Sequence, residues 1–186
     1  ARDIMATGDT ENRRLGLEWL EAVIKAFYPA EPIGADANRV EAEGWFSPDD
    51  DCVGRIIDLF AQARQTVDVC VFTITDNRIA ETILRAHERG VRVRVISDDD
   101  KAFDKGSDIG HLRSRGVECR EDNTQHHMHH KFAIFDHQLL LTGSYNWTRS
   151  ASLNNEENFV ISGDPRLLKN FARMFDKLWA DFGRTS

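Results

Sequence analysis

The sequence has few cysteines and no long apolar segment. Its three cysteines, Cys52, Cys70 and Cys119, are widely spaced and odd in number, which excludes a zinc finger of the usual spacing and a disulfide framework. No apolar run approaches the roughly 18 residues that a membrane-spanning helix needs. Residues 1–30 lack a basic start followed by an apolar block, the pattern of a signal peptide. We therefore expect a cytoplasmic protein in a reducing compartment.

Positive charge is also scarce. The chain has 24 Lys and Arg against 31 Asp and Glu, which gives a formal net charge of −7. This balance argues against a protein that coats nucleic acid through phosphate contacts alone, although it is compatible with a local basic groove. Hydrophobic residues make up 41% of the 186 residues and charged residues 30%, as in an ordinary globular domain.

Apolar periodicity divides the chain into a short N-terminal part and one larger domain. Residues 11–28 have the spacing of an amphipathic helix, and residues 29–39, with two prolines and a glycine, predict a connector. From residue 40 to 186, predicted strands alternate with predicted helices, which indicates an α/β domain with three layers, α/β/α, around a mixed, largely parallel sheet. The predicted strands are 40–47, 67–74, 91–97, 128–135, 138–142 and 158–162, and the predicted helices follow Asp49–Asp51 and Asp76 and cover 109–112 and 165–182.

One short segment, residues 126–158, carries residue types suited to attack on a phosphodiester. His129 and Lys131 are two residues apart on a predicted strand, so their side chains face the same side. A neutral imidazole can attack phosphorus and form a phosphohistidine, and an ammonium can stabilise the charge that develops on the oxygens. Alone, this pair would be an ordinary polar strand edge; its neighbours favour a catalytic site.

Those neighbours follow the next predicted strand. Gly143 permits close backbone approach, while Ser144 and Asn146 offer short hydrogen-bond donors to phosphate oxygens. Glu157 is the candidate that orients the imidazole, with Glu156 as a competing assignment. A simple turn and ordinary surface charge are the alternatives for these residues taken singly.

Three further residues are candidates with open alternatives. Asp136 is either part of the catalytic set or a structural residue of the turn to His137. Tyr145 and Trp147 flank Asn146, so we predict that they bind substrate by stacking on bases. For Trp147, packing in the core is the competing interpretation.

The histidine-rich stretch could also suggest a metal site. His126, His127, His129 and His130 have neither the helical H-x-x-x-H spacing nor a nearby cysteine. The Lys131 ammonium would also repel a cation. We therefore predict no metal, and assign His127 and His130 to packing or support.

The order H-x-K-x4-D-x6-G-S-x-N, formed by His129, Lys131, Asp136, Gly143, Ser144 and Asn146, resembles the signature of the phospholipase D superfamily. The segments VDVCVFTITDNRIAETILRAHERGVRVRVISDDD, HMHHKFAI and LLTGSYNWTRSA are similar to the mitochondrial cardiolipin hydrolase group, which includes the Zucchini-type endonuclease. The likeness covers about residues 40–180. It implies a phospholipase D-like fold and a homodimer with a shared active site, in which one His129 attacks and His129 of the partner subunit protonates the leaving oxygen. It implies no metal and no other cofactor.

Two features of that group are not visible here. Eukaryotic members carry an N-terminal membrane anchor, and Zucchini-type proteins insert a cysteine/histidine zinc module where this chain has SPDDDCVG with Cys52 alone. We therefore expect a soluble, bacterial member that cleaves single-stranded DNA or RNA. The alternatives are a hydrolase of cardiolipin-like phospholipids, with membrane lipid as its partner, and a binding module without catalysis, which the intact signature does not favour.

Overall fold

The chain divides into two units, Ala1–Arg39 and Val40–Ser186. The computed structural model describes Trp19, residues 42–102 and residues 106–183. Trp19 is helical and exposed. The rest of the helix predicted over 11–28, and the connector predicted over 29–39, lie outside the described residues, so the assignment of residues 1–39 stays a prediction.

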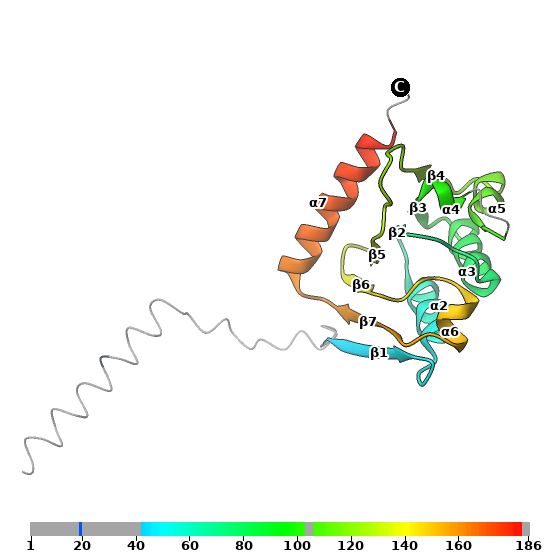
Figure 1. The fold of residues 1–186 in the computed structure, drawn as a ribbon. Coiled ribbons are helices and arrows are strands. Elements are labelled where there is room, and N and C mark those ends of the chain that lie inside the picture. The colour runs from blue at the N-terminus through cyan, green and yellow to red at the C-terminus, as the bar shows by residue number, and fades with distance from the viewer. Residues whose placement is uncertain (1–18, 20–41, 103–105, 184–186) are drawn as a thin grey trace, which may run out of the picture. The chain divides into compact units, whose positions relative to one another are not determined.

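Within the described part of the second unit, seven strands form one sheet in the order β1-β7-β6-β5-β2-β3-β4 (Figure 1). The pairs β2–β3 and β3–β4 are parallel, and the other four pairs are antiparallel. The predicted mixed sheet is confirmed, but antiparallel pairs outnumber parallel ones. The reason is that β5 and β6 are joined by a three-residue turn, whereas parallel neighbours need a long crossover. The strands are β1 (Glu43–Ser47), β2 (Thr66–Val71), β3 (Arg92–Ser97), β4 (Glu118–Glu121), β5 (Lys131–Phe135), β6 (Leu139–Gly143) and β7 (Glu157–Ser162).

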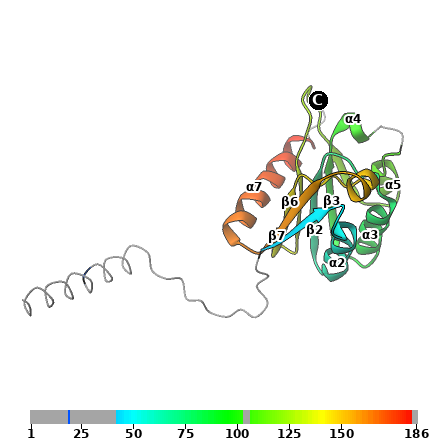
Figure 2. The same cartoon turned by 60° about the horizontal axis from the view of Figure 1, so that its bottom comes forward.

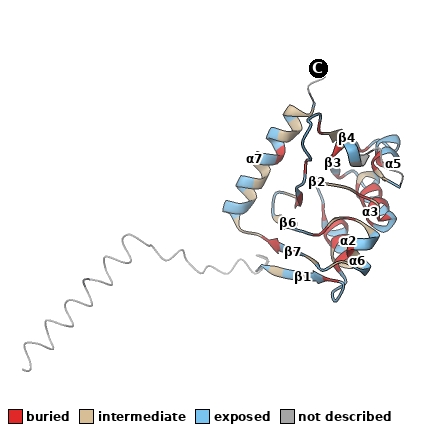
Figure 3. Ribbon diagram, in the orientation of Figure 1, coloured by how far each residue is buried: buried red, intermediate tan, exposed pale blue. Residues whose placement is uncertain are grey.

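Helices cover both faces of this sheet, which confirms the three-layer architecture (Figure 2). One face packs against α2, α3, α5 and α6, and the other packs against α7. Figure 3 shows buried residues on the strands and on the helices that cover them. No helix in the described ranges is long and apolar enough to cross a membrane. The helices are α2 (Cys52–Gln62), α3 (Asn77–Glu88), α4 (Asp99–Ala102), α5 (Ile109–Ser114), α6 (Arg149–Leu153) and α7 (Pro165–Asp181).

Short polar side chains begin the main helices. The carboxylates of Asp51, Asp76 and Asp164 accept backbone N–H bonds at the starts of α2, α3 and α7. These bonds satisfy donors that the first turn of a helix leaves without partners. The predicted starts after Asp51 and Asp76 are therefore confirmed, while the short helices α4 and α6, of four and five residues, were not predicted.

The strand register brings Lys131 and Gly143 to the same end of the sheet. Lys131, at the start of β5, lies opposite Val71 at the end of β2. Gly143, at the end of β6, pairs with Phe159 near the start of β7. This end of the sheet, which we call the site edge, therefore combines the first residues of β5 and β7 with the last residues of β2, β3 and β6.

Candidate active site

His129 and Lys131 meet at the start of β5. The Lys131 side chain is buried, whereas His129 precedes the strand and is exposed. The Lys131 ammonium donates a hydrogen bond of 2.9 Å to the backbone carbonyl of His129. The Phe72 ring, just beyond β2, lies 4.7 Å from the His129 ring and 5.0 Å from the Lys131 Nζ. The structure thus places an accessible imidazole beside a cation whose position is fixed.

The surroundings of His129 favour its neutral form. Burial lowers the pKa of the His129 imidazole, and the charges of Lys131 and His127 lower it further. The Asp98 carboxylate acts in the opposite direction. Burial also lowers the pKa of Lys131, and the carboxylates of Glu157 and Asp98 partly offset this effect. A neutral imidazole has the free nitrogen lone pair that nucleophilic attack requires.

Gly143 and Ser144 form the end of β6 beside β7. A Cβ at position 143 would lie 2.1 Å from the Asn158 carbonyl oxygen, so only glycine fits here. The close approach predicted for Gly143 is therefore to a neighbouring strand, and the structure gives its predicted substrate contact no support. Ser144 is exposed, and its Oγ accepts a 3.0 Å hydrogen bond from the Asn158 N–H. The Ser144 Oγ also donates to the Asn158 carbonyl oxygen at 3.5 Å, a long bond for which a substrate oxygen would compete.

Glu157 is positioned by two asparagines. Its Oε2 accepts the Asn146 backbone N–H at 2.6 Å and the Asn146 Nδ2 at 3.4 Å, and its Oε1 accepts the Asn155 Nδ2 at 2.7 Å. Within the described residues of this chain, Glu157 contacts Asn146 and Asn155, and its predicted role in orienting His129 stays a prediction. Glu156, the competing candidate, is exposed.

Asp136 lies at the opposite end of β5 from His129. Its Oδ1 accepts the backbone N–H groups of Gln65 and Thr66 at 2.8 and 2.9 Å, and its Oδ2 accepts that of Arg64 at 2.8 Å. Asp136 also has a positive φ of 50° in the β5–β6 turn. Because β5 separates it from the candidate nucleophile, its catalytic assignment is corrected to the structural alternative.

Tyr145 and Trp147 are both fully buried. The Trp147 ring packs edge-on against Phe60, 6.0 Å away, and the Tyr145 ring packs edge-on against Phe159, 5.7 Å away. A ring enclosed in this way has no free face on which a base could stack. The predicted substrate contacts of Tyr145 and Trp147 are therefore wrong, because both rings pack inward after β6 and complete the core beneath α2.

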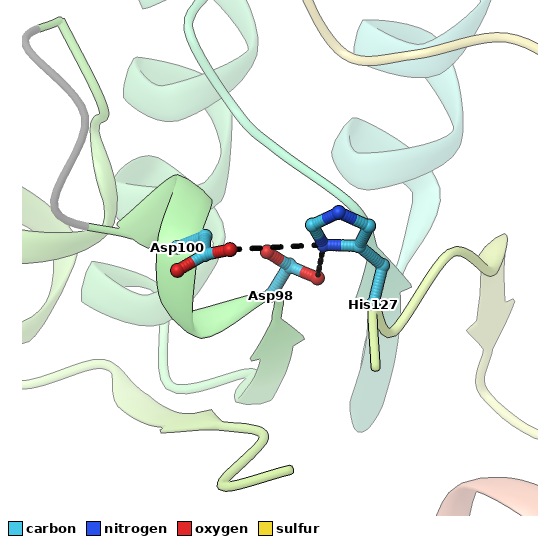
Figure 4. Close-up of side chains that lie close together, drawn as sticks. All are labelled: Asp98, Asp100 and His127. Carbon is cyan, nitrogen blue, oxygen red and sulfur yellow. Dashed lines mark hydrogen bonds and ion pairs between the residues drawn. The ribbon is translucent and has the colours of Figure 1, made fainter. Parts of the chain in front are cut away.

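The sequence interpretation overlooked Asp98. This residue directly follows β3 and is completely buried, and its Oδ2 lies 3.1 Å from the Nδ1 of His127 (Figure 4). Three aspartates in succession after a buried strand, at 98–100, were the signal that could have drawn attention to it. Asp98, Asp100 and His127 bring three possible metal ligands within 4.8 Å of one another, as do Asp98, Asp99 and Asp122. Carboxylate and imidazole ligands suit several divalent cations, so the predicted absence of a metal stays a prediction.

Sequence comparisons agree with the resemblance seen in the signature. The family described as cardiolipin synthase, PLD-like domain, matches residues 56–179. A mitochondrial cardiolipin hydrolase of Chlamydomonas reinhardtii is 50% identical over 130 residues, which are 70% of this chain and 58% of the relative. The Homo sapiens protein of the same name is 39% identical over 133 residues, covering 72% of this chain and 53% of that protein. The chain thus spans somewhat more than half the length of these relatives.

Solved structures share the fold. Nuc from Salmonella typhimurium, described as a phospholipase D family member, has a TM-score of 0.71 at 23% identity and covers 76% of this chain and 95% of its own. NucT from Helicobacter pylori also has a TM-score of 0.71, at 24% identity, and covers 76% and 96%. With the family match over residues 56–179, these likenesses show that the chain belongs to the PLD-like domain family of the phospholipase D superfamily.

Proposed function

We propose that this chain is a phosphodiesterase that cleaves single-stranded nucleic acid without a metal ion, with His129 as its nucleophile. The proposal rests on one observation: the His129 ring and the Lys131 ammonium both lie against the Phe72 ring. The imidazole is exposed to an incoming phosphate, while the ammonium is buried and held by a hydrogen bond. A fixed cation beside the nucleophile can stabilise the charge that develops on the phosphoryl oxygens.

The proposed reaction has two steps. In the first step, an imidazole nitrogen of His129 forms a bond to phosphorus while the P–O bond to the leaving group breaks. The leaving oxygen takes a proton from a second imidazole, which starts the cycle protonated. A water oxygen then attacks phosphorus, the P–N bond breaks, and the water gives one proton to the second imidazole, which is then ready for another cycle. In each step, Lys131 would hold a non-bridging oxygen, and Ser144 and Asn146 lie at the same edge as hydrogen-bond donors.

The second imidazole is proposed to be His129 of the partner subunit in a homodimer. Two exposed apolar side chains at the site edge support an interface there, Phe46 at 58% and Leu153 at 61% exposure. Phe46 pairs in register with Asn158, which bonds to Ser144. Exposed apolar groups beside a polar site are typical of surfaces that become covered on association. Light scattering should therefore give twice the chain mass of 21.2 kDa.

Nucleic acid is the proposed substrate because an exposed cation lies near the site. Arg149 is exposed at the start of α6, three residues after Asn146, whereas Arg78, although 46% exposed, is already paired with the buried Asp76 carboxylate. A polyanion with phosphates on both sides of the scissile group could use such a charge. The apolar stripe of α7, in contrast, packs against Phe132 and the sheet. It is therefore occupied and does not offer a face for a bilayer.

Hydrolysis of a cardiolipin-like phospholipid is the alternative. It is favoured by two relatives, 50% and 39% identical to this chain, that are named mitochondrial cardiolipin hydrolase. The same nucleophile and cation would serve it, since both substrates are phosphodiesters. A cytoplasmic location remains part of the nucleic-acid proposal.

The test compares two substrates in the presence of EDTA. Wild-type protein, His129→Ala and the control His137→Asn are incubated with labelled single-stranded oligonucleotide and, separately, with cardiolipin vesicles. His137 is an exposed histidine at the other end of β5, with a positive φ that asparagine accepts well. Cleavage of the oligonucleotide by wild type and His137→Asn, but not by His129→Ala, is the expected result.

Other outcomes would revise the proposal. Release of phosphatidic acid without oligonucleotide cleavage would identify a lipid hydrolase. Oligonucleotide binding with neither reaction would indicate a binding module. An active monomer, or loss of cleavage on chelation, would contradict the shared site or the metal-free mechanism. Acid-labile phosphate on His129 during turnover would support the covalent step.

A further inference from the structure

A buried carboxylate stands behind the site edge, where Asp98 follows β3. Its side chain is fully shielded from water, and its Oδ2 accepts the Met128 backbone N–H at 3.0 Å. The same oxygen lies 3.1 Å from the His127 Nδ1. A buried charge is costly unless hydrogen-bond donors compensate it. Asp98 is therefore tied to the two residues that directly precede His129.

These contacts fix the His127 ring. Because a carboxylate can only accept, the His127 Nδ1 is the donor in this hydrogen bond. The second ring nitrogen points away from both Asp98 and Asp100 (Figure 4). The His127 side chain is 57% exposed, and the Asp100 carboxylate, 73% exposed, lies 4.0 Å from the same Nδ1. His127 is thus anchored on its inner edge and open to solvent on the other.

The anchored ring shares a support with His129. Phe72 contacts the His127 ring edge-on at 5.6 Å and the His129 ring at 4.7 Å. Met128, between the two histidines, is buried and held by Asp98. The segment that presents His129 is consequently held at its backbone, at the preceding ring and through a common aromatic neighbour.

We propose that Asp98 and His127 form a positioning pair, in which the buried carboxylate fixes the backbone and the ring that set how His129 faces its substrate. Asp98 and His127 act through His129, which remains the proposed nucleophile. The role in turnover rests on the proposed function, but the control of the His129 ring by this pair does not depend on any substrate. This role also accounts for the buried Asp98 carboxylate, which takes no direct part in the proposed phosphodiesterase mechanism.

The charges around His129 make this proposal measurable. His129 is faced by Lys131 from β5, by His127 and His130 from the segment before β5, and by Asp98 from the end of β3. Asp98 raises the pKa of His129, and His127 lowers it. Removing either member of the pair should therefore move the His129 titration, and in opposite directions. Since charge alone moves the titration, the positioning role is separated from support of the fold by a loss of kcat at unchanged KM in a folded variant.

The experiment uses Asp98→Asn, His127→Gln and Asp100→Asn in the 186-residue chain. Asparagine at position 98 keeps the size and one acceptor oxygen but removes the charge. Asp100→Asn is the matched control, because it removes the same charge from an exposed carboxylate near the same ring. The His129 imidazole is titrated by NMR on labelled protein, and kcat and KM are measured on an oligonucleotide.

We expect Asp98→Asn to lower the pKa of His129 and to reduce kcat by about 10- to 100-fold, the usual range for a lost orienting contact, with little change in KM. His127→Gln should raise the pKa of His129 and reduce kcat less. Asp100→Asn should leave both close to wild type. Equal effects of Asp98→Asn and Asp100→Asn, or an unchanged His129 titration in a folded Asp98→Asn protein, would overturn the pair.

Two safeguards keep the result decisive. If Asp98→Asn does not fold, His127→Gln decides, since that side chain is largely exposed, and an unchanged His129 titration in it overturns the proposal. If wild type hydrolyses neither substrate, the proposed function fails, but the NMR titration still tests whether Asp98 and His127 control the His129 ring. A His129 titration that changes when EDTA is added would assign Asp98, Asp100 and His127 to a bound cation and would also overturn it.

Discussion

Replacing Asp136 should lower stability and leave hydrolysis nearly intact. Its carboxylate accepts three backbone hydrogen bonds from Arg64, Gln65 and Thr66, at the end of β5 that is remote from His129. In Asp136→Asn, one oxygen can keep the bonds to Gln65 and Thr66, while the new amide group faces the Arg64 N–H without an acceptor. In Asp136→Ala all three bonds are lost, and alanine also tolerates the positive φ of 50° less well than asparagine.

The magnitude follows from the surroundings of these bonds. A hydrogen bond to a charged group contributes about 1.5–3 kcal/mol, but Arg64 and Gln65 are exposed, so water replaces part of what is lost. We therefore expect about 1–2 kcal/mol of destabilisation for Asp136→Asn and about 2–3 kcal/mol for Asp136→Ala. In a domain of this size, the alanine variant should melt roughly 6–10 °C lower.

The dependence on pH adds a second check. Burial raises the pKa of Asp136, but the N–H groups of Thr66, Gln65 and Arg64 lower it more, so the folded pKa lies below the ordinary value. A depressed carboxyl pKa contributes stability above the unfolded pKa, and that contribution disappears as the pH falls through the folded pKa. The difference in melting temperature between wild type and Asp136→Asn should thus shrink below about pH 4.

The assay pairs thermal unfolding with oligonucleotide cleavage at a temperature where all variants are folded. Wild-type kcat in Asp136→Asn, together with a lower melting temperature, is the expected result. A variant that melts like wild type but loses more than about 100-fold in kcat, the size of a lost general acid or base, would restore Asp136 to the catalytic set.

The remaining predictions concern the site and its core. The kcat/KM of the proposed hydrolysis should first rise with pH as the attacking imidazole of His129 loses its proton, with a midpoint below the ordinary histidine value because burial and Lys131 lower this pKa. It should fall again at higher pH, where the second imidazole no longer holds the proton for the leaving oxygen. A rising limb with its midpoint above the ordinary value would contradict the assignment. Gly143→Ala should destabilise the fold by about 3 kcal/mol in urea unfolding, because its Cβ would clash with the β7 backbone, and wild-type stability would refute the proposed strand contact. Trp147→Phe should cost about 2–3 kcal/mol without changing KM for an oligonucleotide; a tenfold higher KM at unchanged stability would show that the ring does bind substrate.

Much of the architecture could be predicted because local patterns agreed with the fold. The buried strand around Val69, the helix start at Asp76 and the apolar stripe of α7 each correspond to an observed element. The direction of β5, β6 and β7 was harder to foresee, since apolar runs do not encode whether neighbours are parallel. The structure shows that the short turn at Asp136 and His137, with positive φ at both residues, joins β5 and β6 in a hairpin.

The candidate site was predicted in part. His129 and Lys131 are two residues apart and therefore stay close whatever the strand register, and in the structure both lie against Phe72. Spacing could not show whether a side chain points outward or into the core, which is why Trp147 was misassigned. It also could not show that Asp98, distant in sequence, lies behind His127, because parallel pairing of β3 with its neighbours determines that contact.

Among the described residues, α7 is the helix that covers one side of the sheet, so damage at this helix should expose that side. Within the same part of the chain, α7 shields Cys70, Ile96 and Phe132 in the second hydrophobic cluster, and Phe132 follows Lys131 on the same strand. Arg94 and Arg120 lie over the Trp179 ring and fasten the last turns of the helix. A proteolytic cut near Asp164 would therefore weaken the packing of α7 on β5, the strand that carries Lys131. Such a cut should both abolish the proposed turnover and expose apolar residues that promote aggregation.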